Sequence, residues 1–354
     1  PVQVVGAGEW SMDADLNNNG SGFLLFAQTS NVTTTSALVS AVTIVAADAD
    51  ILCEFLGYTA DIHIKTSITI DSTISLGARQ TGFHLRDFEM DHIDTNGTFT
   101  VGGEDTAHIV IDGFTYAGQA RLFVIEAMHQ HNSTFMIIGT APNSFVQPLV
   151  VNTRASLTIN ASLSVIGTIT VDADRDCNFK FGLPGSSERL LVRGDAIVGP
   201  GATITSTNNE IYWRSHTLHL GGNFDSGTMP IVFSMCPGGA IDIGGHGENG
   251  LAHFSLSQQE LRRLKSTNLT FETERGDIVV FDVDIMDTND IIGHVKLNAS
   301  SNMGKISFFG ADAALKTLYA YAGNGTVIMS DIRTTEADMI IAGDHMHSGN
   351  CLKH

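Results

Sequence analysis

The sequence predicts an all-β protein: a right-handed parallel β-helix, or β-solenoid, with one short helical decoration in each of two repeats. Three observations predict this fold. Short runs rich in Val, Ile and Thr recur about every 8–12 residues, with polar turns between them. The 354 residues contain no helical pattern long enough to cross over between the strands of a layered sheet. Finally, a stretch near the C-terminal end has an earlier counterpart in the chain.

The composition is that of a folded, strand-rich chain. Only 16% of the residues are charged and 43% are hydrophobic, which excludes a disordered chain. The 36 glycines and 7 prolines, set among many Thr, Ser, Asn and Asp residues, are typical of strands joined by tight turns. Strands continue along the whole chain, beyond the ~100–250 residues over which sandwiches and barrels usually close. This favours a solenoid.

The first half begins with a polar, weakly patterned segment, residues 1–18. A helix-like turn follows residue 85, and an acidic turn near residue 172 ends this half. Strands are expected at residues 23–27, 37–40, 42–46, 51–55, 61–64, 68–70, 73–76, 98–101, 109–111, 122–127, 134–138, 146–151, 156–159, 163–165 and 168–171.

The second half begins near Cys177 and ends in a loop-like segment after Asp344. Strands are expected at residues 178–181, 189–192, 196–198, 203–205, 211–213, 217–220, 231–235, 240–243, 269–272, 277–283, 294–298, 305–309, 315–321, 326–329 and 338–341.

The repeated stretch covers residues 254–285 and, in a divergent copy, residues 85–114. The later copy has a helix-like turn at residues 257–264, followed by two strands. In the earlier copy three residues occupy the positions of Glu260, Leu261 and Leu264, namely Glu89, Met90 and Ile93. We interpret Glu260, Arg262 and Arg263 as the solvated side of a short surface helix.

The repeats are offset by roughly 170 residues, so we expect a first repeat at residues 1–176 and a second, continuous with it, at residues 177–354. A β-helix coil of ~22 residues would give about sixteen coils stacked at the spacing of paired strands. Inward positions would form columns of Val, Ile, Leu, Phe and Ala.

The repeated stretch resembles the β-helix repeats of giant secreted surface proteins, of the filamentous-haemagglutinin and large-adhesin kind, including very large extracellular proteins of algae and protists. The resemblance implies a structural role in stalks, fibrils or adhesive surfaces, with further repeats of the same polypeptide as neighbours. The sequons and cysteines depart from the family pattern. The resembling motifs are FSLSQQELRRL (254–264), NLTF (268–271), GDIVV (276–280), HVKLNA (294–299), GKISF (304–308) and ADAAL (311–315).

The N-x-S/T pattern of N-glycosylation recurs through the chain and predicts a secreted eukaryotic glycoprotein, extracellular or on the cell surface. The candidate sites are Asn19, Asn31, Asn96, Asn132, Asn160, Asn268, Asn298 and Asn324. Four cysteines, Cys53, Cys177, Cys236 and Cys351, show no zinc-site spacing, and their pairing stays open. A bond between Cys177 and Cys351 within one chain is unfavourable, because a solenoid would separate them by several coils.

The formal net charge of −19 argues against nucleic acid and anionic membranes as partners, because binding to phosphates needs Lys and Arg. No apolar run approaches ~18 residues, so no membrane span is expected. The chain starts at Pro1 without a signal sequence, and we interpret it as a mature or excised piece.

Catalytic patterns are weak, and we predict that the protein is not an enzyme. Gly245-His246-Gly247-Glu248 resembles the GHG motif of pectin-hydrolysing β-helix enzymes. Asp242 is nearby, but the paired Asp residues and the basic motif of those enzymes are missing. We interpret the motif as a glycine-rich corner.

Metal-binding patterns are equally weak, so no cofactor is expected. The pairs His129/His131 and His345/His347 would each share a strand face, but no carboxylate or Cys motif joins them. The Asp-rich turns at residues 172–176 and 282–290 lack known calcium-loop spacings and allow at most weak Ca²⁺ binding.

These features predict a structural subunit or segment of an extracellular filament, sheath, flagellar hair or adhesin. It would assemble with copies of itself through β-helix ends and sides. The alternative is a carbohydrate-binding or polysaccharide-cleaving β-helix protein. Two Trp and five Tyr provide few aromatic platforms for a sugar groove.

Overall fold

The computed structural model confirms that the chain is mostly β, with long parallel sheets. It divides into two compact units. Unit 1 consists of Pro1–Asp176 and Lys180–Val192, and unit 2 of Cys177–Phe179 and Arg193–His354. The structure describes residues 2–4, 7–16, 21–34, 38–67, 72–78, 82–129, 134–139, 141–175, 177, 194–245, 254–343 and 346–348.

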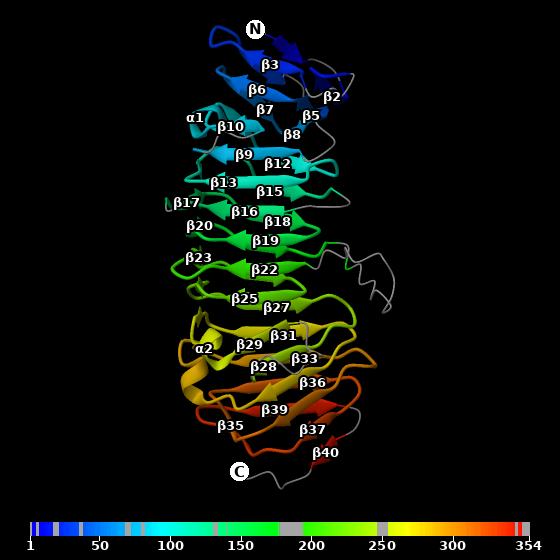
Figure 1. Ribbon diagram of the computed structural model, residues 1–354, viewed down its shortest axis with the longest axis vertical. Helices are drawn as coiled ribbons and strands as arrows, with labels where there is room; N and C mark the ends of the chain where they lie inside the picture. Colours follow the sequence, from blue (N-terminus) through cyan, green and yellow to red (C-terminus); the bar gives the residue numbers. More distant parts are fainter. Residues whose placement is uncertain are drawn as a thin grey trace. The chain divides into compact units, whose positions relative to one another are not determined.

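Unit 1 contains three stacks of parallel strands, one strand above the next in Figure 1. Stack 1 is continuous, whereas stacks 2 and 3 are each interrupted once. In order of pairing, stack 1 contains β2 (Gly8–Asp13), β5 (Val39–Ala46), β8 (Asp61–Thr66), β12 (Thr98–Gly103), β15 (Leu122–Ala127), β18 (Leu149–Thr153) and β21 (Ile169–Asp172). Stack 2 contains β3 (Phe23–Phe26) and β6 (Asp48–Ile51), then β10 (Phe83–Leu85), β9 (Thr73–Gly77), β13 (His108–Asp112), β16 (Thr134–Ile138) and β19 (Ser156–Ile159). Stack 3 contains β1 (Val2–Val4), β4 (Val32–Thr34), β7 (Phe55–Tyr58) and β11 (Ile93–Thr95), then β14 (Thr115–Tyr116), β17 (Asn143–Phe145) and β20 (Leu163–Val165).

Unit 2 has the same three kinds of stack, again with stack 1 continuous and the other two interrupted once. Stack 1 contains β24 (Ile211–Arg214), β27 (Ile231–Met235), β31 (Leu269–Thr273), β33 (Val295–Ala299), β36 (Leu318–Ala322) and β39 (Met339–Gly343). Stack 2 contains β22 (Asp195–Val198) and β25 (Thr217–Leu220), then β29 (Phe254–Ser257), β28 (Ile241–Gly244), β32 (Ile278–Phe281), β34 (Ile306–Phe309), β37 (Thr326–Ile328) and β40 (Met346–Ser348). Stack 3 contains β23 (Thr203–Ser206), β26 (Asn223–Asp225) and β30 (Leu264–Lys265), then β35 (Ala313–Leu315) and β38 (Ile332–Thr334).

The core of each unit is built from columns of apolar side chains that occupy equal positions in successive strands. Because side chains alternate along a strand, every second residue of stack 1 points inward. Burying each such side chain contributes about 1.5–3 kcal/mol relative to leaving it exposed. One column of unit 1 contains Ile62, Phe99, Phe123, Leu149 and Ile169.

The corresponding column of unit 2 is also buried and passes through five strands of stack 1. It contains Ile211, Ile231, Leu269, Val295 and Leu318. In the neighbouring column the rings of Phe233 and Phe271 stack with centroids 5.7 Å apart. The predicted inward columns are thus present in both units.

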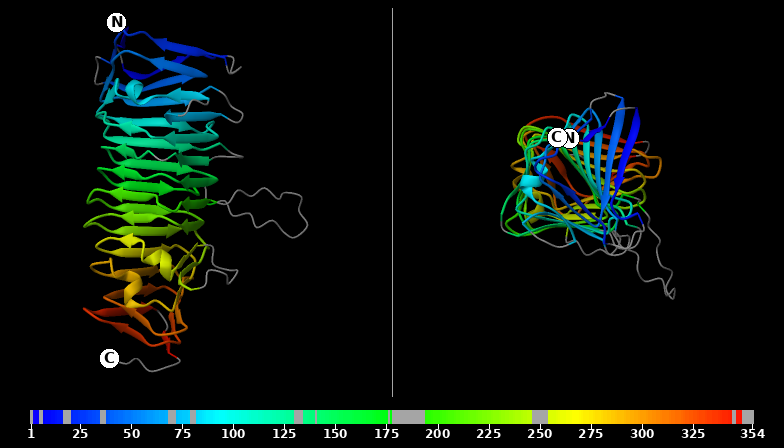
Figure 2. Two further views of the ribbon diagram at one scale, coloured as in Figure 1. Left: turned by 60° about the vertical axis from the view of Figure 1, so that its left-hand side comes forward. Right: turned by 90° about the horizontal axis from the view of Figure 1, so that it is seen from above.

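Three short helical segments accompany the strands: α1 (Asp87–Met90), α2 (Gln258–Leu261) and the 3₁₀ turn η1 (Ile285–Thr288). In Figure 2, α1 (cyan) and α2 (yellow) lie on the outer side of the strands of their own units. The helix predicted at residues 257–264 is therefore shorter than expected. Leu264 already belongs to β30, whose backbone pairs with β26.

Some strand boundaries differ from the sequence predictions. One strand, β5, replaces the two predicted at residues 37–40 and 42–46. The strand predicted at residues 51–55 is instead a corner, because β6 ends at Ile51 and β7 begins at Phe55. Ile51, Cys53 and Phe55 are all buried, so the alternation typical of a strand continues through the corner and hides it. The strands predicted at residues 68–70, 178–181 and 189–192 lie outside the described residues.

Candidate functional site

In both units the solenoid is interrupted by an extra strand followed by a helical turn. In unit 1 the chain leaves β9 and forms β10 beside it, with Phe83 opposite Ile74. In unit 2 it leaves β28 and forms β29 beside it, with Phe254 opposite Ile241. The turns α1 and α2 follow, and the chain re-enters stack 3 as β11 or β30.

A glycine ends the strand that precedes each extra strand. Gly77 has φ +92° and Gly244 has φ +85°, values that favour glycine. A Cβ atom on Gly77 would lie 2.3 Å from the carbonyl oxygen of Asp112, and one on Gly244 would lie 2.3 Å from that of Phe281. The chain therefore turns in close contact with the next coil at both places.

The extra strand breaks the backbone pairing of stack 2. In the described part of unit 1, β10 contacts β6 but belongs to a different sheet. In the described part of unit 2, β29 has the same relation to β25. Side chains supply hydrogen bonds across these two breaks, and the residues that do so form the candidate site.

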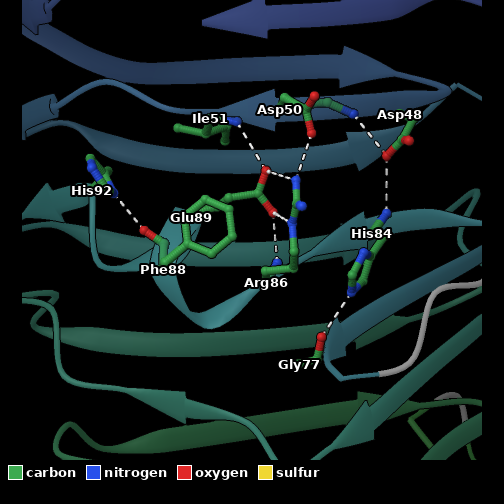
Figure 3. Close-up of polar contacts among 10 residues, drawn as sticks. Asp48, Asp50, Ile51, Gly77, His84, Arg86, Phe88, Glu89 and His92 are labelled. Carbon is green, nitrogen blue, oxygen red and sulfur yellow. Dashed lines mark hydrogen bonds and ion pairs between the residues drawn. The ribbon is translucent and has the colours of Figure 1, made fainter. Parts of the chain in front are cut away.

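Glu89 is the central residue of the break in unit 1, and it is completely buried. Its Oε1 accepts the N–H of Ile51, at the end of β6, at 3.2 Å. Its Oε2 accepts the backbone N–H of Arg86 at 2.8 Å, which caps α1. Figure 3 shows the carboxylate of Glu89 between these two parts of the chain.

Arg86 reinforces this contact. Its Nε lies 3.0 Å from Oε2 of Glu89, and its other end donates to Asp50 of β6 at 2.8 Å (Figure 3). The hydrogen bond to Glu89 raises the pKa of Arg86 above its usual value. The guanidinium group also lies over the ring of Phe88, 4.7 Å from its centroid. Arg86 thus links α1 to β6 through charge.

A second bridge lies at the other end of the same break. Asp48, the first residue of β6, accepts the backbone N–H of His84 in β10 at 3.2 Å. The ring Nε2 of His84 donates to the carbonyl of Gly77 at 2.8 Å (Figure 3). The contact with Asp48 replaces a backbone hydrogen bond that a continuous sheet would have made, and the contact with Gly77 holds His84 against its own neighbour β9.

Glu260 has the same role at the break in unit 2. Its Oε1 accepts the N–H of Leu220, at the end of β25, at 3.0 Å. Its Oε2 accepts the backbone N–H and the hydroxyl of Ser257, each at 2.8 Å. Arg263 donates to the carbonyl of Leu220. We call Glu89 and Glu260, with these partners, the glutamate clamps.

The prediction that Glu260, Arg262 and Arg263 form a solvated face is wrong. Glu260 and Arg263 are half-buried, and both bind the last residue of β25. Arg262 is exposed, but it forms an ion pair at 2.8 Å with Asp287, which is completely buried. Asp287 in turn accepts the N–H of Asp284 at 2.7 Å, capping η1.

The clamps are suited to holding strands together rather than to proton transfer. In both, the carboxylate accepts N–H groups from two segments of the chain, and charge-assisted hydrogen bonds of this kind are the stronger ones. Such bonds also satisfy N–H groups that would otherwise be buried without a partner. Each carboxylate therefore connects two segments of the chain through hydrogen bonds.

The catalytic candidates lie partly in described residues. His246, Gly247 and Glu248 are outside them. Asp242, in β28, is buried, and within the described part of the chain its Oδ1 has no hydrogen-bond partner. Desolvation raises the pKa of this carboxyl. Its register neighbours on the adjacent strands are Ser255 and Val279, so these positions supply no second carboxylate.

The two histidine pairs that the sequence analysis weighed as metal ligands are only partly described. His131 and His345 lie outside the described residues, His129 is half-buried after β15, and His347 belongs to β40. In the turn that begins at Asp172, that carboxylate accepts the N–H of Asp174.

The second Asp-rich turn uses its carboxylates in the same way. Asp282 accepts the N–H of Ala311, and Asp284 accepts that of Ile285 at 2.5 Å. Together with Asp287 they bind four groups of the protein, the backbone N–H groups of three residues and the guanidinium of Arg262. Weak Ca²⁺ binding by these turns stays a prediction.

The eight glycosylation candidates differ in accessibility. Asn19 and Asn132 lie outside the described residues. Asn268 is half-buried, and its side-chain oxygen accepts the N–H of His294 at 3.1 Å. Asn298 is half-buried within β33. The exposed candidates are Asn31, Asn96, Asn160 and Asn324.

The cysteine pairing left open by the sequence is partly defined. Cys177 and Cys236 form a disulfide, with Cα atoms 5.5 Å apart. Cys53 is buried and has a free thiol. Cys351 lies outside the described residues.

Comparisons with known proteins provide no family for this chain. No family model matches it, and neither curated proteins nor solved structures give a match. None of the helices in the described part is long and apolar enough to cross a membrane.

Proposed function

We propose that the chain is a structural segment of an extracellular filament, sheath, flagellar hair or adhesin. In this proposal it is a right-handed parallel β-helix of two divergent repeats, residues 1–176 and 177–354. It associates with copies of itself or with further repeats of the same polypeptide. The observation that carries the proposal is an unpaired strand edge in each unit, at β2 in unit 1 and at β39 in unit 2, within the described residues.

Among the described residues, the first strand of stack 1 in unit 1, β2, pairs only with β5. Its inward residues Trp10 and Met12 stand opposite Val42 and Ile44, which are completely buried, yet they are themselves only half-buried. An unpaired strand edge beside partly exposed core residues is a template for another strand. This supports stacking of a further coil here.

The last strand of stack 1 in unit 2, β39, has the same character. Within the part of the chain that the structure describes, it pairs only with β36. Met339 and Ile341 stand opposite the buried residues Leu318 and Ala320, but both are only half-buried. A second edge therefore also supports the addition of a coil.

Two further observations support an extracellular location. The Cys177–Cys236 disulfide is typical of oxidising compartments. Four glycosylation candidates are exposed, as acceptors on a secreted protein must be. N-glycans are accordingly part of the proposal.

Electron microscopy and sedimentation velocity of the full chain test the proposal. We expect linear or lateral assemblies that grow with concentration and with salt, because salt screens the repulsion between chains of net charge −19. Trp10→Lys and Ile341→Lys should each shorten the assemblies. Ile166→Lys, at an exposed residue in the turn after β20, is the control and should leave them intact.

Isolated monomers at every concentration, both in recombinant protein and in native material, would contradict the proposal. So would assemblies that are equally long in Trp10→Lys, Ile341→Lys and the parent chain. Circular dichroism of each variant shows whether the fold is retained, so that loss of assembly is not confused with unfolding.

A further inference from the structure

A surface pocket in unit 1 combines features that suit a sugar ring. It has a volume of about 190 Å³ and lies beside stack 3, where the sheet ends after β11. Its walls come from β7, from β11 and the turn after it, and from the turn after β14. The lining residues are Leu56, Tyr58, Asp94, Thr95, Asn96 and Gln119.

Tyr58 is the aromatic residue in the lining of this pocket. It is 54% exposed, although tyrosine is a large and partly apolar residue. Its backbone has φ +47°, which is unusual for a bulky side chain. Such backbone strain is concentrated at functional sites. The carbonyl of Tyr58 accepts the N–H of Asn96, which fixes the two residues side by side.

Asn96 is an exposed residue in the turn between β11 and β12, and with Gly97 and Thr98 it forms a glycosylation sequon. The turn is firmly held. The hydroxyl of Thr95 donates to the carbonyl of Ala60 at 2.5 Å and accepts the N–H of Gly97 at 2.9 Å. The acceptor asparagine therefore has a fixed position at the edge of the pocket.

Polar groups complete the pocket. One carboxylate oxygen of Asp94 accepts the backbone N–H of Gln119 at 3.2 Å, which joins the last strand of this sheet to the next coil. A carboxylate and an amide beside an aromatic face match a pyranose, which has hydroxyls at its rim and C–H groups on its faces. This combination of groups points to a carbohydrate rather than to an anion.

We propose that Asn96 carries an N-glycan and that the pocket seats its first N-acetylglucosamine against Tyr58. The proposal rests on the extracellular location proposed above. In the modification, the side-chain amide nitrogen of Asn96 forms a bond to C1 of the sugar and gives up a proton. The bond from C1 to the lipid diphosphate carrier breaks, and the diphosphate leaves with the electron pair. The seated sugar then covers the end of the sheet.

Glycopeptide mass spectrometry of the full chain from a glycosylating secretory host is the first test. We expect Asn96 to be occupied. Asn160 and Asn324, also exposed, are internal controls for the competence of the host. If these controls carry glycans and Asn96 does not, the inference fails while the proposed function stands. If none of the three is modified in native material, the extracellular location itself fails.

The second test asks whether the first sugar is seated. An endoglycosidase that leaves one N-acetylglucosamine should preserve Tm, whereas an amidase, which hydrolyses the side-chain amide, removes the whole glycan and leaves aspartate at position 96, should lower it by about 2 °C. In Tyr58→Ala this difference should disappear. The matched control carries a glycan only at Asn160, where we expect the two enzymes to have equal effects. Equal effects at Asn96 in the parent chain would overturn the seating.

A third measurement separates the two sources of sugar. Protons of the first N-acetylglucosamine should show upfield ring-current shifts in NMR spectra, and Tyr58→Ala should abolish them. Free chitobiose is then titrated into unglycosylated chain. Saturable binding that requires Tyr58, together with normal shifts for the Asn96 glycan, would assign the pocket to an external saccharide and overturn our assignment.

Discussion

At the scale of single residues, the glutamate clamps show how a buried charge is accommodated. Glu89 is completely buried, yet its carboxylate accepts hydrogen bonds from Ile51 and from both the backbone and the side chain of Arg86. A buried charge is tolerated only when it is paired and hydrogen-bonded. The sequence aligns Glu89 with Glu260, but it cannot show these partners, because Ile51 lies 38 positions away in the chain.

Truncation of the clamp should destabilise the protein. Glu89→Ala leaves the N–H groups of Ile51 and Arg86 without acceptors and Arg86 without its buried partner. We expect a loss of about 2–3 kcal/mol in the free energy of unfolding, measured by denaturant titration. Glu89→Gln keeps an acceptor and should cost less, about 1 kcal/mol. Glu104→Ala, at an exposed residue, is the control and should change stability by less than about 0.5 kcal/mol.

Asp242 should make stability depend on pH. Desolvation raises its pKa in the folded protein. The folded state then binds this proton more tightly than the unfolded state, so the free energy of unfolding falls as pH rises through the folded pKa. Asp242→Asn should remove this fall. The free energy of unfolding of the variant should exceed that of the parent by more at about pH 7 than at about pH 3. A gain that is constant over this range, or one matched by Asp312→Asn at an exposed position, would contradict the assignment.

At the scale of elements, the sequence predicts the helical turns but neither the extra strands before them nor what these strands interrupt. The order of helical turn and strands is visible in residues 85–114 and 254–285, and both turns are present as α1 and α2. The breaks in stacks 2 and 3 are not visible, because β10 and β29 have the same alternating apolar pattern as any other strand. Only pairing partners distinguish an inserted strand from a regular one.

The glycines before the extra strands should be intolerant of any side chain. Gly77→Ala and Gly244→Ala combine positive φ with a carbonyl oxygen 2.3 Å from the new Cβ. Gly201 has a similar φ of +84° but nothing within 4 Å of its Cβ position. Gly201→Ala should therefore lower the free energy of unfolding only by the cost of the left-handed backbone, about 1–2 kcal/mol. Gly77→Ala and Gly244→Ala should lower it clearly more. If denaturant titrations gave the same loss of stability for all three variants, the prediction would be wrong, because the structure would have moved to remove the close contacts.

At the scale of the whole molecule, the parallel solenoid-like architecture was predictable because it depends on patterns that repeat: short strands, glycine turns and inward apolar residues. Stack 1 of each unit follows these patterns without interruption. Corners were less predictable, as the continued alternation from Ile51 to Phe55 illustrates. The disulfide was not predictable, because cysteine pairing depends on distance in space rather than on spacing in sequence.

The disulfide should contribute measurably to stability. Cys177 and Cys236 are 59 positions apart, and closing a loop of this length in the unfolded chain is worth about 4 kcal/mol. Replacing both cysteines by serine should lower the free energy of unfolding by up to this amount. Non-reducing peptide mapping should recover the two cysteine peptides as one linked species. Recovery of both as free thiols from freshly secreted protein would contradict the assignment.

The glutamate clamps affect how the cooperativity of unfolding of this protein can change by mutation. Backbone pairing between coils hardly depends on sequence, because every residue except proline carries the same donor and acceptor. Stack 1 stays paired at both breaks, but in stack 2 part of the coupling between neighbouring coils depends on Glu89 and Glu260. In a solenoid the stability is approximately a sum of the stability of each coil and the interactions between neighbouring coils. A single substitution at either break therefore changes how far unfolding spreads along the chain. Mutations at Glu89 or Glu260 can thus change which segments of the chain unfold together.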